Sequence, residues 1–168
     1  MNRLHHILDI SEILRLVESG ADVNLKDVDG GTALHVSRSS AATRALIDHG
    51  AVVNENNSRG MSSLHRARNV GVAKELTRNG ALVNSVDNFG NTPLHYASDL
   101  QVARALLTSG ADPNLRNMKG ETPIHMSRYG HKVLALANVG ADVDSVGNTG
   151  KTLLMKKDIT GVFMFSVC

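Results

Sequence analysis

The sequence contains no tryptophan, and aromatic residues make up only 3% of its 168 residues. A large aromatic core and a platform for stacking nucleic-acid bases are therefore not expected. Cys168 is the only cysteine, which excludes a disulfide within the chain and a zinc site built from several cysteines. This low cysteine content fits a reducing compartment.

Long apolar runs and a strong net charge are absent as well. No run approaches 18 apolar residues, and the N-terminal MNRLHHILDI lacks the apolar region of a signal peptide. The 18 basic and 16 acidic residues leave a formal charge of +2, which is too balanced to predict nucleic-acid binding. We expect a folded intracellular, cytoplasmic protein without a membrane span, or one that is delivered into a host cell.

A repeat of 30 residues runs through the chain. Glycine recurs at this spacing, and leucine, asparagine and a second glycine keep the same register. The columns are Gly20, Gly50, Gly80, Gly110 and Gly140; Leu16, Leu46, Leu76, Leu106 and Leu136; Asn24, Asn54, Asn84, Asn114 and Asp144; Gly30, Gly60, Gly90, Gly120 and Gly150. These columns predict five stacked units, at about 1–30, 31–60, 61–90, 91–120 and 121–150, with a partial sixth over 151–168.

Each unit is predicted to form two short helices and a turn. In NTPLHYAS, Thr92 is a good N-cap and Pro93 suits the first helical position. Asp99 offers a second N-cap and opens the helix LQVARALLTS, which Gly110 ends. The positions equivalent to Asp99 hold Asp9, Ser39 and Asn69, which are also strong caps. This column of caps is independent evidence for two helices in each unit.

These motifs resemble the ankyrin repeat. The resemblance lies in GNTPLHYA with GADPN, and in the echoes GETPIHMS, GGTALHVS and GMSSLHRA. It implies an all-α solenoid of stacked helix–turn–helix repeats with projecting β-turn or hairpin loops, as a single domain over 1–168. The family unit usually has 33 residues, so this chain has a shorter link between its two helices. The fifth unit departs further, because Tyr129 stands where the other units have a cap.

Histidine forms a further column, at His5, His35, His65, His95 and His125. A shared metal would require ring nitrogens about 2 Å from one ion, whereas stacked helical layers lie roughly 8–10 Å apart. We therefore expect each ring to hydrogen-bond the backbone or the nearby threonine and to fix the turn to the helix. The asparagine column is expected to secure the turns through bonds from side chain to backbone.

No catalytic constellation is evident. The stretch GNTGKT lacks the first glycine of a phosphate-binding loop, because Ser145 occupies that position. No nucleophile–base pair and no set of metal ligands stands out. The sequence therefore predicts a protein that is not an enzyme and that has no cofactor and no metal.

The resemblance implies that partners bind at the turn tips and at the exposed edge of the first helix. Arginine, methionine and aromatic residues, which are enriched at interfaces, occupy several of these positions. Phe89 is the predicted centre of binding, unless its ring lies down on the neighbouring turn. The candidate partner-binding residues are Arg59, Met61, Arg66, Arg68, Phe89, Asn91, Tyr96, Met118, Lys119, Glu121, Met126 and Arg128.

An arginine column allows two interpretations. Arg38, Arg68 and Arg128 share one position, which Ser98 interrupts. These residues either complement the dipole at the end of the first helix or form a basic stripe that meets an acidic partner.

We expect a non-catalytic scaffold or adaptor that binds another protein. The alternative is the substrate-targeting part of a larger enzyme, ligase adaptor or pathogen effector whose activity lies outside this chain. Nucleic-acid binding through the arginines is a third and weaker hypothesis, and no small-molecule substrate is expected. We expect a monomer, with self-association through the apolar ending VFMFSVC as the alternative.

Overall fold

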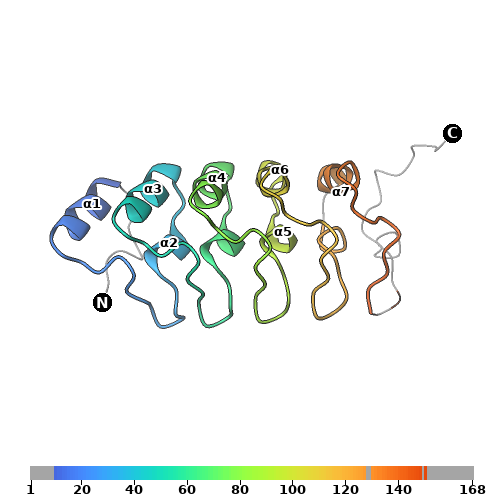
Figure 1. The fold of residues 1–168 in the computed structure, drawn as a ribbon, viewed down its shortest axis with the longest axis horizontal. Coiled ribbons are helices and arrows are strands. Elements are labelled where there is room, and N and C mark those ends of the chain that lie inside the picture. The colour runs from blue at the N-terminus through green and yellow to red at the C-terminus, as the bar shows by residue number, and fades with distance from the viewer. Residues whose placement is uncertain (1–9, 128–129, 149, 151–168) are drawn as a thin grey trace.

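The computed structural model describes residues 10–127, 130–148 and 150, and its units stack in a single row (Figure 1). The longer helices follow one another along one edge of the row, and the loops between units project along the opposite edge. The longer helices are α1 (Ile10–Glu18), α3 (Ser40–Asp48), α4 (Val70–Arg78), α6 (Leu100–Thr108) and α7 (Gly130–Ala137). The described part of the chain is thus the all-α solenoid that the repeat predicts.

One-turn elements lie between the longer helices and the loops. They are α2 (Ala33–Val36), the 3-10 helix η2 (Ser63–Arg66) and α5 (Pro93–Tyr96). Thr92 is the N-cap of α5 and Pro93 stands in its first turn, as predicted. The 30-residue unit leaves a shorter link than the 33-residue family unit, which predicts a short first helix, and these three units have one.

The corner between the two helices of a unit is made by the predicted caps. The side-chain oxygens of Ser39, Asn69 and Asp99 each accept a hydrogen bond from a backbone N–H three residues on, over 3.4, 2.9 and 3.0 Å. Such a cap satisfies one of the backbone donors that a helix start leaves unpaired. Gly80 then ends α4 with a φ of 82°, a conformation that favours glycine. The cap predicted at Asp9, the departure at Tyr129 and the partial sixth unit lie outside the described residues.

The fifth unit lacks the expected first helix. Residues Pro123–Met126 form only a turn. In α5 the backbone N–H of Ala97 donates to the carbonyl of Pro93 over 3.0 Å, which closes an α-helical turn. At the equivalent place the Ser127 hydroxyl occupies the carbonyl of Pro123, and the Ser127 N–H donates to Ile124 instead. The N–H of Ala67, at the equivalent place in η2, also donates to the carbonyl three residues before it, so the same departure from an α-helical turn occurs without a serine.

The core is a row of buried leucine side chains that pack between neighbouring units. Each outer helix packs on the next, in the order α1, α3, α4, α6 and α7. The largest fully buried side chains include Leu34, Leu46, Leu64, Leu76, Leu94, Leu106, Ile124 and Leu136. Burying one such side chain contributes roughly 1.5–3 kcal/mol. Because each outer helix packs on the helices of the neighbouring units, the stability of a unit depends on its neighbours.

The histidine column joins each unit to the next. In His95 the ring Nδ1 accepts from the backbone N–H of Thr92 over 3.0 Å, and the hydroxyl of Thr92 lies 2.9 Å away. With Nδ1 an acceptor, the proton is on Nε2, which donates to the carbonyl of Glu121 over 3.0 Å. His35 and His65 repeat this pattern with the carbonyls of Met61 and Asn91. The predicted local bonds are confirmed, and the bond to the following unit is an addition.

The asparagine column also reaches across units. The amide of Asn54 donates to the carbonyl of Gly80 over 2.9 Å, and its oxygen accepts from the N–H of Leu82 over 2.9 Å. Asn24, Asn84 and Asn114 make the same pair of bonds to their neighbours. The expected bonds from side chain to backbone exist, but they fix the spacing of two units rather than the geometry of one turn.

A lysine occupies a core position of the fifth unit. Lys132 is only 2% exposed, and Ala42, Val72 and Val102 stand at the equivalent positions of the preceding units. Its Nζ donates to the carbonyl of Leu94 over 3.3 Å. Burial lowers the pKa of Lys132 from 10.5 to about 8, because the charged form loses its hydration.

No helix in the described part of the chain is long and apolar enough to cross a lipid bilayer.

Replacing Lys132 with Val should stabilise the protein. A fall of the lysine pKa from 10.5 to about 8 corresponds to roughly 3 kcal/mol of unfolding free energy. The unfolded lysine binds its proton more tightly, so the wild type gains stability as the pH rises from about 8 to 10.5. Urea unfolding should therefore show the largest gain for Lys132→Val below pH 8 and a smaller gain at pH 10. A gain that does not change with pH would contradict this origin.

Acid should destabilise the stack through its histidines. Burial lowers the pKa of His35, His65 and His95, against the opposing effect of their bonds to backbone carbonyls. The unfolded chain therefore takes up protons first, and stability present above pH 6.5 is lost as the pH falls below it. Urea unfolding at pH 7.5 and 5.5 measures this loss.

His95→Ala should lower the free energy of unfolding by about 1–3 kcal/mol at pH 7.5, because a buried donor and acceptor lose their partner. It should also weaken the dependence on pH. His49→Ala is the control, because His49 is exposed and lies outside the column. An equal effect of the two substitutions would argue against a special role for the column.

Candidate functional site

Two adjoining hollows open beside the one-turn elements, and together we call them the inner groove. The first, of about 170 Å³, is lined by His35, Val36, Ser37, Arg38, Arg66, Arg68 and Asn69. The second, of about 330 Å³, is lined by Arg59, Met61, His65, Arg66, Ala67, Arg68, Asp87, Phe89, Tyr96 and Ser98. Arg66 and Arg68 line both, so the hollows adjoin along the second, third and fourth units.

The turn tips at the edge of the groove are held by the backbone. The N–H of Asn88 donates to the carbonyl of Arg59 over 3.0 Å, and the N–H of Met118 donates to the carbonyl of Phe89 over 3.0 Å. Gly60 allows this close approach, because a Cβ on it would lie 2.9 Å from the backbone nitrogen of Asn88. The backbone of each tip is therefore positioned before any partner arrives.

Tyr96, the last residue of α5, is held in place by two hydrogen bonds of its hydroxyl group. Its hydroxyl donates to Oδ2 of Asp87 over 2.5 Å and accepts from the amide of Asn91 over 3.1 Å. Burial raises the pKa of Asp87. The hydrogen bonds from the Tyr96 hydroxyl and from the backbone N–H groups of Asn91 and Phe89 together lower it by a larger amount, so the pKa lies below its ordinary value. Burial and the bond to Asp87 raise the pKa of Tyr96. The ring edge is thus fixed, and 37% of the residue stays exposed.

The inner groove carries positive charge. Four arginines line it: Arg38, Arg59, Arg66 and Arg68. Asp87 is its single carboxylate, and this carboxylate is buried under hydrogen bonds. The two lining histidines are uncharged at neutral pH, because burial lowers their pKa values. None of the four arginines makes an ion pair within the described residues.

Six of the candidate residues gather in the second hollow: Arg59, Met61, Arg66, Arg68, Phe89 and Tyr96. Phe89 is 60% exposed, so its side chain remains available at the rim. Four others, Met118, Lys119, Glu121 and Met126, lie one unit further along and do not line this hollow. Arg128 lies outside the described residues.

Asn91 differs from the expectation of an exposed contact. It is only 6% exposed, and its amide binds the Tyr96 hydroxyl while its oxygen accepts from Asn117 over 2.8 Å. Asp87, four residues earlier, draws Asn91 inward, because its Oδ1 accepts a hydrogen bond from the backbone N–H of Asn91. Asn91 therefore supports the groove from beneath.

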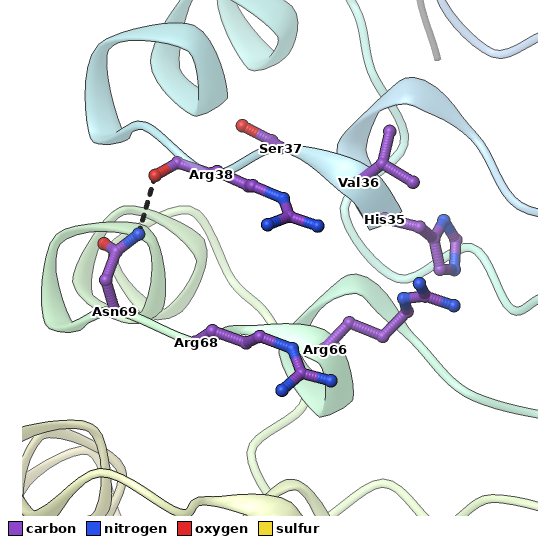
Figure 2. Close-up of a pocket in the computed structure, with 7 residues that line it drawn as sticks. All are labelled: His35, Val36, Ser37, Arg38, Arg66, Arg68 and Asn69. Atoms are coloured by element: carbon purple, nitrogen blue, oxygen red, sulfur yellow. Dashed lines mark hydrogen bonds between the residues drawn. The ribbon is translucent and has the colours of Figure 1, made fainter. Parts of the chain in front are cut away.

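The arginine column follows the first helix of its unit. Arg38 comes directly after Ser37, the C-cap of α2, and Arg68 directly after Ala67, the C-cap of η2. Both side chains face the first hollow together with Arg66 (Figure 2). This placement agrees with both interpretations of the column, because the arginines lie next to a helix end and also line a hollow.

Two features of the groove were missed at the sequence level. Arg38 was considered only as part of its column, and Asp87 was not singled out. The periodic signal for Asp87 exists, because Asp27, Asn57 and Asn117 stand 30 residues apart in the same column. Each accepts, on one side-chain oxygen, the N–H groups two and four residues on. This bond pattern shapes the turn tips of the first four units, whereas Gly147 holds the position in the fifth.

Comparison with known proteins agrees with this architecture. A family model described as ankyrin repeats, in three copies, matches residues 6–87. A second model, for a single ankyrin repeat, matches residues 89–118. Among curated proteins, none matches the chain.

Tyr96→Phe should destabilise the protein by about 1 kcal/mol, because Asp87 loses a hydrogen-bond donor while the ring keeps its packing. The pKa of Asp87 should rise, since that donor favours the carboxylate. The carboxyl carbon shift of Asp87, followed by NMR as a function of pH, measures the change. If Asp87 titrated in the Tyr96→Phe variant as it does in the wild type, the hydroxyl of Tyr96 would not be what stabilises the carboxylate.

Proposed function

Because the chain belongs to the ankyrin repeat family, whose repeats generally act as protein–protein interaction modules, we propose that it is a non-catalytic scaffold that binds a partner protein. The partner lies in the inner groove, against the turn tips and the one-turn helices. The observation that carries this proposal is the gathering of six candidate residues, basic, apolar and aromatic, around one continuous hollow.

The rigidity of the groove supports the proposal. Its tips are tied by backbone bonds, and the histidine and asparagine columns hold neighbouring units at fixed spacing. A surface that is already in place loses little conformational entropy on association, so more of its contact energy appears as affinity. The partly exposed side chains of Phe89 and Tyr96 are of a type that often dominates interface energetics.

We also propose that residues 1–168 form one repeat domain that acts as a monomer inside cells. The continuous packing from α1 to α7 supports a single domain. The low cysteine content supports a reducing environment.

Capture of partners from a cell lysate tests the function. Proteins retained by the immobilised full chain are quantified by mass spectrometry and compared with those retained by Phe89→Ala and Arg66→Ala. Each substitution should lower the retention of a specific partner about tenfold or more, as expected for residues that dominate an interface.

Arg104→Ala is the matched control. Arg104 is an exposed arginine of α6 that lines the outer face between α4 and α6, away from the inner groove. Partners that are retained equally by all four proteins would place the binding surface elsewhere.

A further inference from the structure

The first hollow of the inner groove is polar and cationic. Arg38, from the unit before it, and Arg66 and Arg68, from the unit after it, surround about 170 Å³ (Figure 2). The amide of Asn69 donates to the carbonyl of Arg38 over 2.7 Å. The guanidinium groups are the charged donors around the hollow, and the space suits a small side-chain group.

The fold pairs arginines elsewhere but not here. On the outer helices, Arg44 makes two bonds to the carboxylate of Glu75, over 2.9 and 2.7 Å, and Arg78 makes a third over 3.3 Å. Glu75 is almost completely buried, and its pKa is lowered chiefly by the hydrogen bond from Arg44. No carboxylate lines the first hollow. A cluster of like charges without a counter-ion disfavours the free protein and attracts an anion.

A global excess of charge does not explain the cluster. The formal charge of the chain is only +2, yet four arginines line the inner groove. Guanidinium groups bind carboxylates with planar, paired hydrogen bonds, which gives such a site a preference for acidic side chains.

The second hollow has a mixed lining. Met61, Phe89 and the ring of Tyr96 supply apolar walls, which the first hollow lacks apart from Val36. The polar residues around these walls are Arg59, His65, Arg66, Arg68, Asp87 and Ser98. Phe89 is 60% exposed, so a ligand that covers it gains from burying apolar surface. An aliphatic or aromatic side chain fits this hollow.

The repeat also sets the distance between the two hollows. The first hollow is lined by the second and third units, and the second hollow mainly by the third and fourth, with Arg59 of the second unit also lining it. Packed helices lie roughly 8–10 Å apart. An extended peptide advances about 3.3 Å per residue. Side chains that enter successive hollows are therefore about three residues apart.

From these observations we propose that the inner groove binds an extended acidic peptide segment. A carboxylate side chain enters the hollow of Arg38, Arg66 and Arg68, and an apolar side chain about three residues away enters the hollow of Met61, Phe89 and Tyr96. This inference rests on the proposed function and specifies the chemistry of the partner.

Selection of displayed random 12-residue peptides on the full chain tests the proposal. Enriched peptides should carry Asp or Glu about three positions from a large apolar residue. Their affinities, measured by fluorescence anisotropy, should fall about tenfold or more when that Glu is changed to Gln, because a bond to a charged group is lost.

The double variant Arg66→Gln/Arg68→Gln and the Glu-to-Gln change in the peptide together form a double-mutant cycle. It should bind the Glu peptide about tenfold more weakly and should hardly distinguish it from the Gln peptide, since the interacting pair is already broken. Arg104→Gln should bind both peptides as the wild type does. Thermal melts confirm that each variant is folded.

Failure of the inference differs from failure of the proposed function. Enriched peptides that lack acidic residues but lose affinity with Phe89→Ala would overturn the carboxylate site and keep the groove. Peptides whose binding ignores Phe89→Ala and the double arginine variant would overturn the groove as well.

Other anionic ligands are tested in separate binding experiments. A phosphoserine in place of the Glu that binds more than tenfold tighter would assign the hollow to phosphate. Tighter binding of a 20-base-pair duplex or of phosphatidylserine vesicles than of any peptide, lost in the double variant, would overturn a peptide ligand.

Discussion

Every described part of this protein depends on hydrogen bonds that run from one unit to the next. A one-turn helix of four residues cannot be stable alone, because nucleating a helix costs more than one turn returns. Here the ring of His65 is bonded to its own Ser62 and to the carbonyl of Asn91 in the following unit. Asn54 adds two more bonds to the same neighbour. Together with the buried leucines, these bonds set the spacing of the row.

The same bonds make the inner groove a surface of defined shape. Because His35 holds the carbonyl of Met61 and His65 that of Asn91, the walls of the groove keep their places relative to one another. The histidines are thus structural, and both ring nitrogens of each are occupied. The residues left for recognition are the irregular ones between the columns, where arginine, methionine and aromatic side chains replace one another from unit to unit.

Much of this could be predicted from the sequence. The 30-residue period identifies the units, the caps Ser39, Asn69 and Asp99 locate the corners, and the glycines locate the ends of the outer helices. The turn in place of a helix at Pro123–Met126 could not be predicted, because it depends on which of two neighbouring carbonyls the backbone N–H of Ser127 reaches. The buried state of Asn91 likewise follows from three partners that its position in the repeat does not reveal.

The sequence by itself determined the period, the caps of the outer helices and the family of this protein, because these depend on local conformational preferences that recur from unit to unit. Only the tertiary structure decided which variable residues meet. Arg38 and Arg66 belong to different units, and their shared hollow exists because the units stack at one fixed spacing. Whether an arginine is neutralised, as at Glu75, or left facing an open groove is a matter of which side chains lie opposite it across the stack.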